Sequence, residues 1–121
     1  VDIIASHHQP QEWDSKTCEF EYAGYGMTGL ETAFGVAGAM GITVERWVEM
    51  CAANPRKIFN LPAAGIAEGT KADISLFNPE HSYTFEEKNI RSKSKNSPFI
   101  GKTLKGKVIG IINGEKVFLN S

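Results

Sequence analysis

The sequence predicts an α/β fold built from two successive segments, and three observations lead to this prediction. An apolar run at residues 1–5 opens the chain and leads directly into a polar cluster. Helical periodicity of apolar residues then dominates up to residue 61. From residue 62 onward, short β-prone runs are separated by glycine and proline. We therefore expect a strand, a loop and helices at 1–61, and a β-rich portion with a C-terminal hairpin at 62–121.

The composition is that of one small globular domain. The chain has 121 residues, of which 41% are hydrophobic and 22% charged, and its formal net charge of -1 gives no electrostatic reason to bind nucleic acid or an anionic membrane. Cys18 and Cys51 are far apart and lack metal-ligand spacing, which favours a reduced cytoplasmic setting but leaves one disulfide open. No apolar run approaches the ~18 residues of a membrane span, so we expect a soluble protein. Because Val1 opens the chain in mid-strand, we expect a processed chain or a piece of a longer one.

The opening run is the most informative stretch. Residues 1–5 are almost continuously apolar, which is typical of a strand buried on both faces of a parallel sheet. Its carboxyl end presents Ser6, His7, His8 and Gln11, and barrels of parallel strands build their sites at this end. Adjacent histidines in a loop are more often solvated than bound to metal. A metal site and a plain hydrogen-bonded loop therefore both remain open.

A polar loop is expected at residues 12–26. Loops of this length without a repeating pattern are usually functional or disordered. Four aromatic residues argue against disorder, namely Trp13, Phe20, Tyr22 and Tyr25. We expect the loop either to close over a site or to pack on its own aromatic side chains.

Helix-start signals divide the next part into three helices. Thr28 and Glu31 have the spacing of a capping box, in which each side chain accepts a hydrogen bond from the other residue's backbone amide. This predicts a helix that ends near Gly41, with a catalytic role for Glu31 as the alternative. Thr43 is predicted to cap a second helix, and Asn54, followed by a proline, to cap a third.

The β-rich portion ends in a hairpin signal. Residues 73–77 alternate as a half-buried strand does, and residues 82–86 are a further candidate strand. Residues 90–103 are basic and polar, which predicts a solvated loop, with phosphate binding as the alternative. Asn113 and the following glycine lie between two β-prone runs. This pair suits a tight hairpin turn, in which both central residues need positive φ.

Three runs in the chain resemble the cyclic amidohydrolases. They are Asn-Pro-Arg-Lys-Ile-Phe-Asn-Leu-Pro at 54–62, Gly-Ile-Ala-Glu-Gly-Thr-Lys-Ala-Asp-Ile-Ser-Leu-Phe at 65–77, and Ser-Lys-Ser-Lys-Asn-Ser-Pro-Phe-Ile-Gly at 92–101. The third run narrows the resemblance to the dihydroorotases. The resemblance as a whole covers essentially all 121 residues. The resemblance implies the C-terminal part of such a protein, with residues 1–5 as the last strand of a (β/α)8 barrel. The helices would close the barrel, and residues 62–121 would belong to the accompanying β-sandwich.

The resemblance also implies a reaction, a metal and partners. Dihydroorotases are zinc-dependent hydrolases that interconvert dihydroorotate and N-carbamoyl-aspartate in pyrimidine biosynthesis. The family's His-x-His pair, bridging lysine and other histidine ligands lie on earlier strands, and none of them is in this chain. We therefore expect this segment alone to bind no zinc and to be inactive. The small-molecule substrate is the expected ligand of the parent protein, and uncovered apolar faces predict a homo-oligomer.

The opening cluster departs from the family pattern at two catalytic positions. Where the family carries Thr-Asp-His-Ala-Pro-His, this chain has Ser-His-His-Gln-Pro-Gln at 6–11. The family aspartate, which contacts metal and shuttles a proton, falls on His7, so the resemblance makes His7 the candidate catalytic residue and metal ligand. The family histidine that helps hold the substrate carboxylate falls on Gln11. A downstream segment whose backbone touches substrate falls on Ala-Gly-Tyr-Gly, which adds Tyr25 and Gly26 as candidate substrate-binding residues.

Three interpretations of function follow from these replacements. Loss of a positioned proton shuttle typically costs ~10²- to 10⁴-fold in rate. The parent is therefore either a dihydroorotase with an altered active-site motif or an inactive homologue that scaffolds aspartate carbamoyltransferase. A sister hydrolase acting on hydantoin or allantoin rings is the third interpretation, and the lysine-rich run at 92–99 favours dihydroorotase over it.

Overall fold

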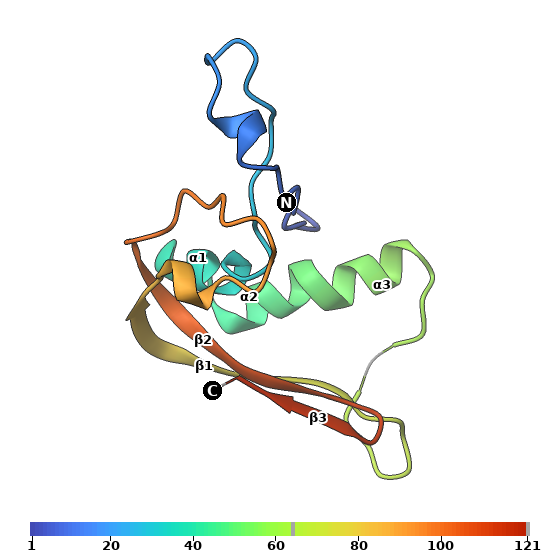
Figure 1. Ribbon diagram of the computed structural model, residues 1–121. Helices are drawn as coiled ribbons and strands as arrows, with labels where there is room; N and C mark the ends of the chain where they lie inside the picture. Colours follow the sequence, from blue (N-terminus) through green and yellow to red (C-terminus); the bar gives the residue numbers. More distant parts are fainter. Residues whose placement is uncertain (64, 121) are drawn as a thin grey trace.

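The computed structural model describes residues 1–63 and 65–120 (Figure 1). A curved antiparallel sheet is packed against helices, and a long loop projects away from both. The regular elements are the helices α1 (Ala33–Ala39), α2 (Val44–Val48) and α3 (Asn54–Ile58), the strands β1 (Asp73–Thr84), β2 (Thr103–Asn113) and β3 (Lys116–Leu119), the π-helical turn η2 (Glu49–Ala53), and the short 3-10 turns η1 (Asp14–Lys16) and η3 (Glu87–Asn89).

The sheet has the strand order β1-β2-β3, with β2 in the centre. Strand β1 pairs with β2 from Asp73 opposite Asn113 to Thr84 opposite Thr103, with irregularities after Leu76 and after Asn78. The two strands predicted at 73–77 and 82–86 are therefore one bent strand. The bend follows from local chemistry, because the Asn78 side chain accepts the Glu80 amide at 3.0 Å and the intervening proline cannot donate to the ladder.

The predicted C-terminal hairpin is confirmed. Strands β2 and β3 pair through Ile112 opposite Val117, and Gly114 in the connecting turn has a φ of 60°. The turn itself lies one residue later than the Asn-Gly pair predicts: Asn113 pairs with Lys116 as the last residue of β2, and the two connecting residues are Gly114 and Glu115. Only Gly114 takes positive φ, which costs glycine nothing.

The core lies where α1 meets β2. Phe85, Ile90 and Leu104 are at most 3% exposed and form one cluster. A Cβ at Gly38 would collide with the backbone oxygen of Lys105, so glycine lets the helix backbone lie directly on the strand. This contact ties the helices to the sheet.

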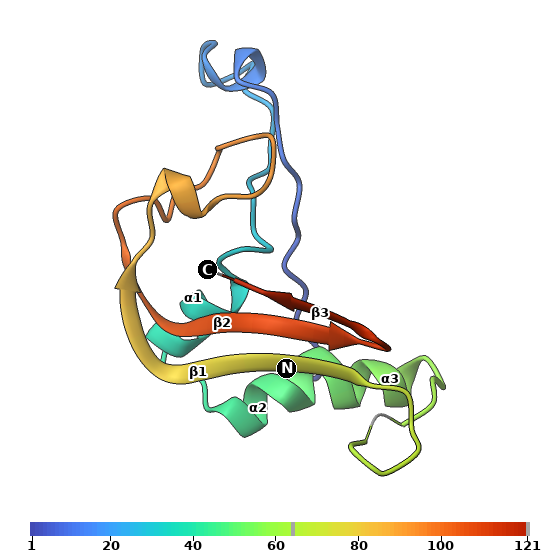
Figure 2. The same ribbon diagram turned by 60° about the horizontal axis from the view of Figure 1, so that its bottom comes forward.

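Helices α2 and α3 form one continuous helix (Figure 2). The predicted cap at Thr43 is confirmed, because its hydroxyl accepts the Arg46 amide at 3.3 Å. The third helix is present as α3, but the predicted cap at Asn54 is wrong, since Asn54 has helical φ and ψ of -66° and -44° and the chain before it is already helical. Proline at 55 lacks the amide that a regular helix would use, and the π-helical turn just before it, in which the Asn54 amide reaches Glu49, carries the helix past this position.

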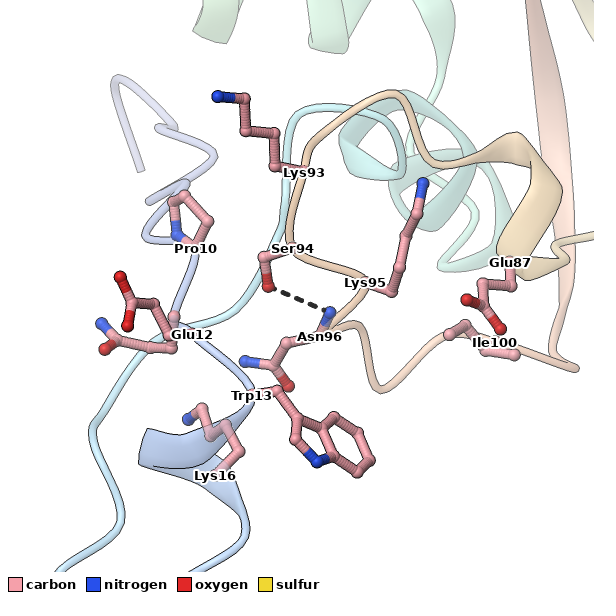
Figure 3. Close-up of a pocket in the computed structure, with 11 residues that line it drawn as sticks. Pro10, Glu12, Trp13, Lys16, Glu87, Lys93, Ser94, Lys95, Asn96 and Ile100 are labelled. Atoms are coloured by element: carbon pink, nitrogen blue, oxygen red, sulfur yellow. Dashed lines mark hydrogen bonds between the residues drawn. The ribbon is translucent and has the colours of Figure 1, made fainter.

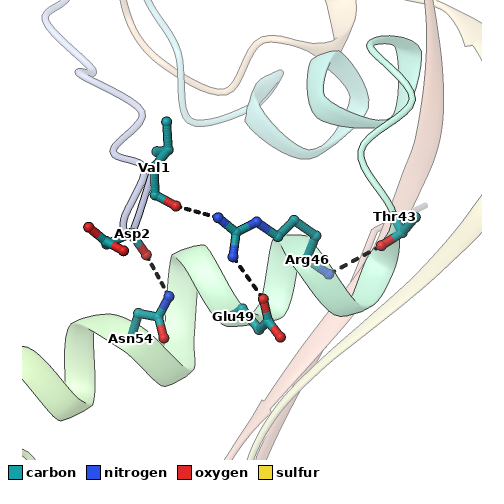
Figure 4. Close-up of polar contacts among 6 residues, drawn as sticks. All are labelled: Val1, Asp2, Thr43, Arg46, Glu49 and Asn54. Atoms are coloured by element: carbon teal, nitrogen blue, oxygen red, sulfur yellow. Dashed lines mark hydrogen bonds and ion pairs between the residues drawn. The ribbon is translucent and has the colours of Figure 1, made fainter.

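Residues 1–5 lie against this long helix rather than in a sheet (Figure 4). Three hydrogen bonds join them to it: the Arg46 guanidinium to the Val1 carbonyl, the Asn54 side-chain amide to the Asp2 carbonyl at 2.7 Å, and the Ile4 amide to the Met50 carbonyl at 3.3 Å. Val1 is 87% exposed, and the described residues offer no strand that pairs with this segment. The buried strand predicted here is therefore not seen in the described chain, because a strand needs a neighbour for its backbone groups.

The loop between residues 10 and 25 projects from the body in both views (Figures 1 and 2). Its aromatic side chains are largely exposed, with Phe20 at 94% and Trp13 at 79%. This contradicts the alternative in which the loop packs on its own aromatic side chains. Among the described residues, no helix is long and apolar enough to cross a membrane.

Candidate functional site

The opening cluster lies beside the start of α1. The Gln9 amide donates to the Met27 carbonyl at 2.9 Å, and the Gln11 side-chain amide donates to the Tyr25 carbonyl at 2.8 Å. The structure thus brings together Gln11, Tyr25 and Gly26, three of the residues singled out from the sequence. It does so through backbone groups, while the Tyr25 ring is 90% exposed.

Gly26 is required by the close approach of the two segments. Its φ is 127°, and an added Cβ would collide with the Gln9 carbonyl oxygen. Any larger residue would therefore be strained and would push the opening cluster away. The Gly26 carbonyl is in turn held by the Asn96 side-chain amide at 2.8 Å.

His7 has an unusual backbone conformation. Its φ is 48°, in the left-handed region that non-glycine residues rarely adopt, and its side chain is exposed. Conformations of this kind cost of order 1–3 kcal/mol and cluster at functional sites. The imidazole can accept a proton or bind a metal, but it lacks the negative charge of a carboxylate.

His8 is anchored by hydrogen bonds to the backbone, a contact that the sequence did not predict. Its Nδ1 accepts the Gly29 amide at 3.0 Å and the Leu30 amide at 3.3 Å. Because Nδ1 is an acceptor, the neutral ring carries its proton on Nε2. The signal was present, since His8 falls on the histidine that the family motif keeps.

The predicted capping box at Thr28 and Glu31 is wrong. Thr28, which is 1% exposed, donates from both its amide and its hydroxyl to the Asn96 carbonyl, at 2.8 and 3.1 Å. Glu31 instead accepts the amide and hydroxyl of Ser92 on Oε1, at 2.9 and 2.7 Å. Both side chains thus bond to residues of the 92–96 loop, which is distant in sequence, and not to each other's backbone amides.

The Glu31 carboxyl is held in its ionised form. Burial opposes ionisation, but the two Ser92 hydrogen bonds, with help from the nearby His8, lower the pKa below its ordinary value of 4.5. The second oxygen, Oε2, is buried and has no hydrogen-bond partner among the described residues. A carboxylate tied to Ser92 in this way serves to hold the 92–96 loop against α1.

A pocket of about 710 Å³ opens between the projecting loop and the 92–96 loop (Figure 3). It is lined by Pro10, Gln11, Glu12, Trp13, Lys16, Glu87, Lys93, Ser94, Lys95, Asn96 and Ile100. The lysines are partly engaged, since Lys95 donates to the Ile90 carbonyl at 2.6 Å and Lys16 to the Gly24 carbonyl. The pocket therefore offers an aromatic wall beside Gln11, and its lysine ammonium groups remain charged.

The side chains that the structure describes do not form a zinc site by themselves. No group of three histidine, cysteine, aspartate or glutamate side chains converges among residues 1–63 and 65–120. His8 has one ring nitrogen occupied, which leaves Nε2, and His7 could supply one ligand. A tetrahedral zinc site needs three or four protein ligands, so the others would have to come from elsewhere.

Comparison with known proteins identifies close sequence relatives, although no family model matches the chain. The chain is 40% identical to a dihydroorotase of Clostridium acetobutylicum, 38% identical to one of Syntrophus aciditrophicus and 41% identical to one of Clostridioides difficile. Each match covers 98% of this chain and 29% of the relative. The chain thus spans well under half the length of these proteins.

Solved structures share the fold. A D-hydantoinase (dihydropyrimidinase) from a Thermus species superposes with a TM-score of 0.82 at 20% identity, over 99% of this chain and 28% of the hydantoinase. A second D-hydantoinase gives a TM-score of 0.68 at 24% identity, over 89% of this chain and 25% of its own. These matches show that the chain shares the fold of the corresponding part of the D-hydantoinases. The sequence matches identify its family: the 121 residues belong to the dihydroorotase family.

Proposed function

We propose that the chain is the C-terminal part of a dihydroorotase-type hydrolase. In this proposal residues 1–61 supply the last barrel strand, the active-site loop and the closing helices, and residues 62–121 supply strands of the β-sandwich. Two observations support it. Similarity extends over 98% of the chain, and residues 1–5 are apolar yet lack a partner strand among the described residues.

The site proposed for this protein is an altered version of the family site. His7 takes the place of the aspartate that moves a proton between water and the ring nitrogen. The observation that carries this is its left-handed backbone, with a φ of 48°, next to the anchored His8. A neutral imidazole can move a proton but supplies no anionic charge, so we expect ring hydrolysis to be reduced by roughly 10²- to 10⁴-fold.

The substrate-binding side of the site is weakened as well. Gln11 stands where the family has the histidine that helps hold the substrate carboxylate, and its amide already donates to the Tyr25 carbonyl. A glutamine amide is neutral, so Gln11 offers a substrate carboxylate no positive charge. Tyr25 and Gly26 would contact substrate through their backbone, as the resemblance implies.

Zinc, if held by the whole protein, would depend mainly on residues outside this chain. His7 is the one metal ligand that we assign here. We expect the 121-residue chain alone neither to bind zinc tightly nor to hydrolyse dihydroorotate, because one or two imidazoles do not make a zinc site.

A graft tests the proposed site. The matching 29% of the Clostridium acetobutylicum dihydroorotase is replaced by these 121 residues, in one form as they stand and in another with His7→Asp and Gln11→His together. Dihydroorotate hydrolysis and zinc content are measured for both. The altered site predicts that the double replacement raises turnover at least ~10²-fold over the unmodified graft.

The control is folding of both grafts, followed by circular dichroism and gel filtration. Equal turnover by two folded grafts would contradict the proposed effect of His7 and Gln11. Two folded, zinc-loaded and inactive grafts would contradict the wider proposal that this segment completes a dihydroorotase site.

The second candidate function is a silent scaffold for aspartate carbamoyltransferase. It is favoured by the loss of charge at both replaced positions together with a projecting loop that exposes Trp13 and Phe20. Sedimentation of the unmodified graft with purified aspartate carbamoyltransferase should then give a complex, and a Trp13→Ala, Phe20→Ala graft should bind more weakly. Independent sedimentation of the two proteins would exclude this role, and the graft's own size shows whether it forms the expected homo-oligomer.

A further inference from the structure

We propose that Asn96 is a positioning residue for His8, acting through the backbone of residues 26–30. The inference rests on the proposed function only in placing His8 at the active site. It assigns a role to the 92–96 loop, which the sequence predicted to be a plain solvated loop.

Asn96 holds the turn before α1 with three hydrogen bonds. Its side-chain amide donates to the Gly26 carbonyl at 2.8 Å, and its backbone carbonyl accepts both the amide and the hydroxyl of Thr28, at 2.8 and 3.1 Å. Thr28 is only 1% exposed, so water competes little for these donors. The contacts link residues that are 68 and 70 positions apart.

Ser92 fixes the other end of the same turn. Its amide and hydroxyl both donate to Glu31 Oε1, at 2.9 and 2.7 Å, and bonds to an ionised acceptor are the stronger kind. The 92–96 loop is therefore hydrogen-bonded to both ends of the turn, at Gly26 and at Glu31. The backbone between these points has little freedom to rotate.

Two backbone amides of this turn point at His8. The Gly29 and Leu30 amides donate to His8 Nδ1 at 3.0 and 3.3 Å. The packing is close, because a Cβ at Gly29 would lie 2.6 Å from the Ser6 carbonyl oxygen. A rotation of the turn would withdraw both amides from the ring.

The consequence is a fixed tautomer. With two donors at Nδ1, the neutral ring is protonated at Nε2 and presents a hydrogen-bond donor there. If the turn loosens, protonation at Nδ1 is no longer excluded, and Nε2 becomes an acceptor in part of the molecules. Asn96 thus determines which chemistry His8 offers without touching it.

Nitrogen NMR of the 121-residue chain, with ¹⁵N-labelled histidine and backbone, tests this at a pH where the ring is neutral. The unsubstituted chain should show His8 protonated at Nε2 only. Asn96→Ala removes the side-chain bond to the Gly26 carbonyl and keeps the two bonds that the backbone carbonyl accepts from Thr28. Loss of the Gly26 bond should move the two His8 nitrogen signals toward each other as tautomers mix, and the Gly29 and Leu30 amides should exchange at least ~10-fold faster. The matched control is Asn89→Ala, which removes a 2.7 Å side-chain bond to the Glu86 amide elsewhere and should leave His8 unchanged.

An unchanged His8 spectrum in a folded Asn96→Ala chain would overturn the proposal. If that variant does not fold, amide exchange in the unsubstituted chain decides: slow exchange at Thr28, Gly29 and Leu30 supports the clamp, and exchange at the rate of exposed loops refutes it. None of these readouts involves turnover, so an inactive graft would leave them unaffected.

Discussion

Replacing Gly29 by alanine should separate the opening cluster from the turn before α1. The added Cβ would lie 2.6 Å from the Ser6 carbonyl oxygen, about 0.8 Å inside the 3.4 Å at which ordinary contacts begin. The three nearest atoms all belong to the backbone of Ser6 and His8, so no flexible side chain can yield. The opening cluster must move outward, which lengthens the bond from the Gly29 amide to His8.

The size of the effect follows from two terms. Overpacking of this kind costs typically about 1–3 kcal/mol, and a lost hydrogen bond adds about 0.5–1.5 kcal/mol. The summed free-energy cost cannot exceed the cost of detaching the opening cluster, because the cluster can move away while the rest of the fold remains intact. We expect a local destabilisation of roughly 1–3 kcal/mol, which corresponds to about 5- to 150-fold in an equilibrium.

Amide hydrogen exchange at Gln9 measures this directly, because its amide bonds to the Met27 carbonyl across the same contact. Exchange at Gln9 should accelerate by that factor in Gly29→Ala. Gly65→Ala is the control, since a Cβ there meets no atom within 4 Å. Unchanged exchange at Gln9 in the folded Gly29→Ala chain would refute the close approach described here.

Three further predictions concern stability, measured by urea unfolding and circular dichroism. Gly38→Ala should destabilise the chain by roughly 1–3 kcal/mol despite alanine's better helix propensity, because its Cβ would strike the Lys105 backbone; equal or greater stability would contradict this packing. Glu31, whose carboxyl pKa is lowered, stabilises the fold above pH 4.5 and loses this contribution as the pH falls through its folded pKa. Glu31→Gln should therefore flatten the pH dependence below 4.5, and an unchanged acid profile would argue against the Ser92 bonds. Phe85→Ala, at 1% exposure, should cost about 3–5 kcal/mol, and a loss under 1 kcal/mol would exclude Phe85 from the core.

Local signals in the sequence predicted local structure well. The Asn-Gly pair predicted a hairpin between the last two β-prone runs, and the hairpin forms there, although only Gly114 takes positive φ and Asn113 ends β2 opposite Lys116. Thr43 caps its helix because the donor is three residues away. Asn54 followed by proline gave the same kind of signal but misled, since a π-helical turn lets the helix pass the proline.

Long-range partners account for most of what the sequence did not reveal. Thr28 and Glu31 have the spacing of a capping box, yet Asn96 and Ser92 supply partners from over 60 residues away. The anchoring of His8 also depends on a partner outside its own segment, since Gly29 lies 21 residues away and nothing in that spacing indicates a contact. Gln11 and Tyr25 were singled out through the family motif, and the structure joins them by a side-chain bond that the motif did not specify.

The turnover ratio of the two grafts tests the central claim most directly. Dihydroorotate hydrolysis is measured for the graft carrying His7→Asp and Gln11→His and divided by that of the unmodified graft, with zinc content equal in both. An altered family site predicts a ratio of ~10² or more. A ratio near one, with ordinary turnover in both, would show that His7 performs the proton transfer unaided and that the replaced motif costs the enzyme nothing.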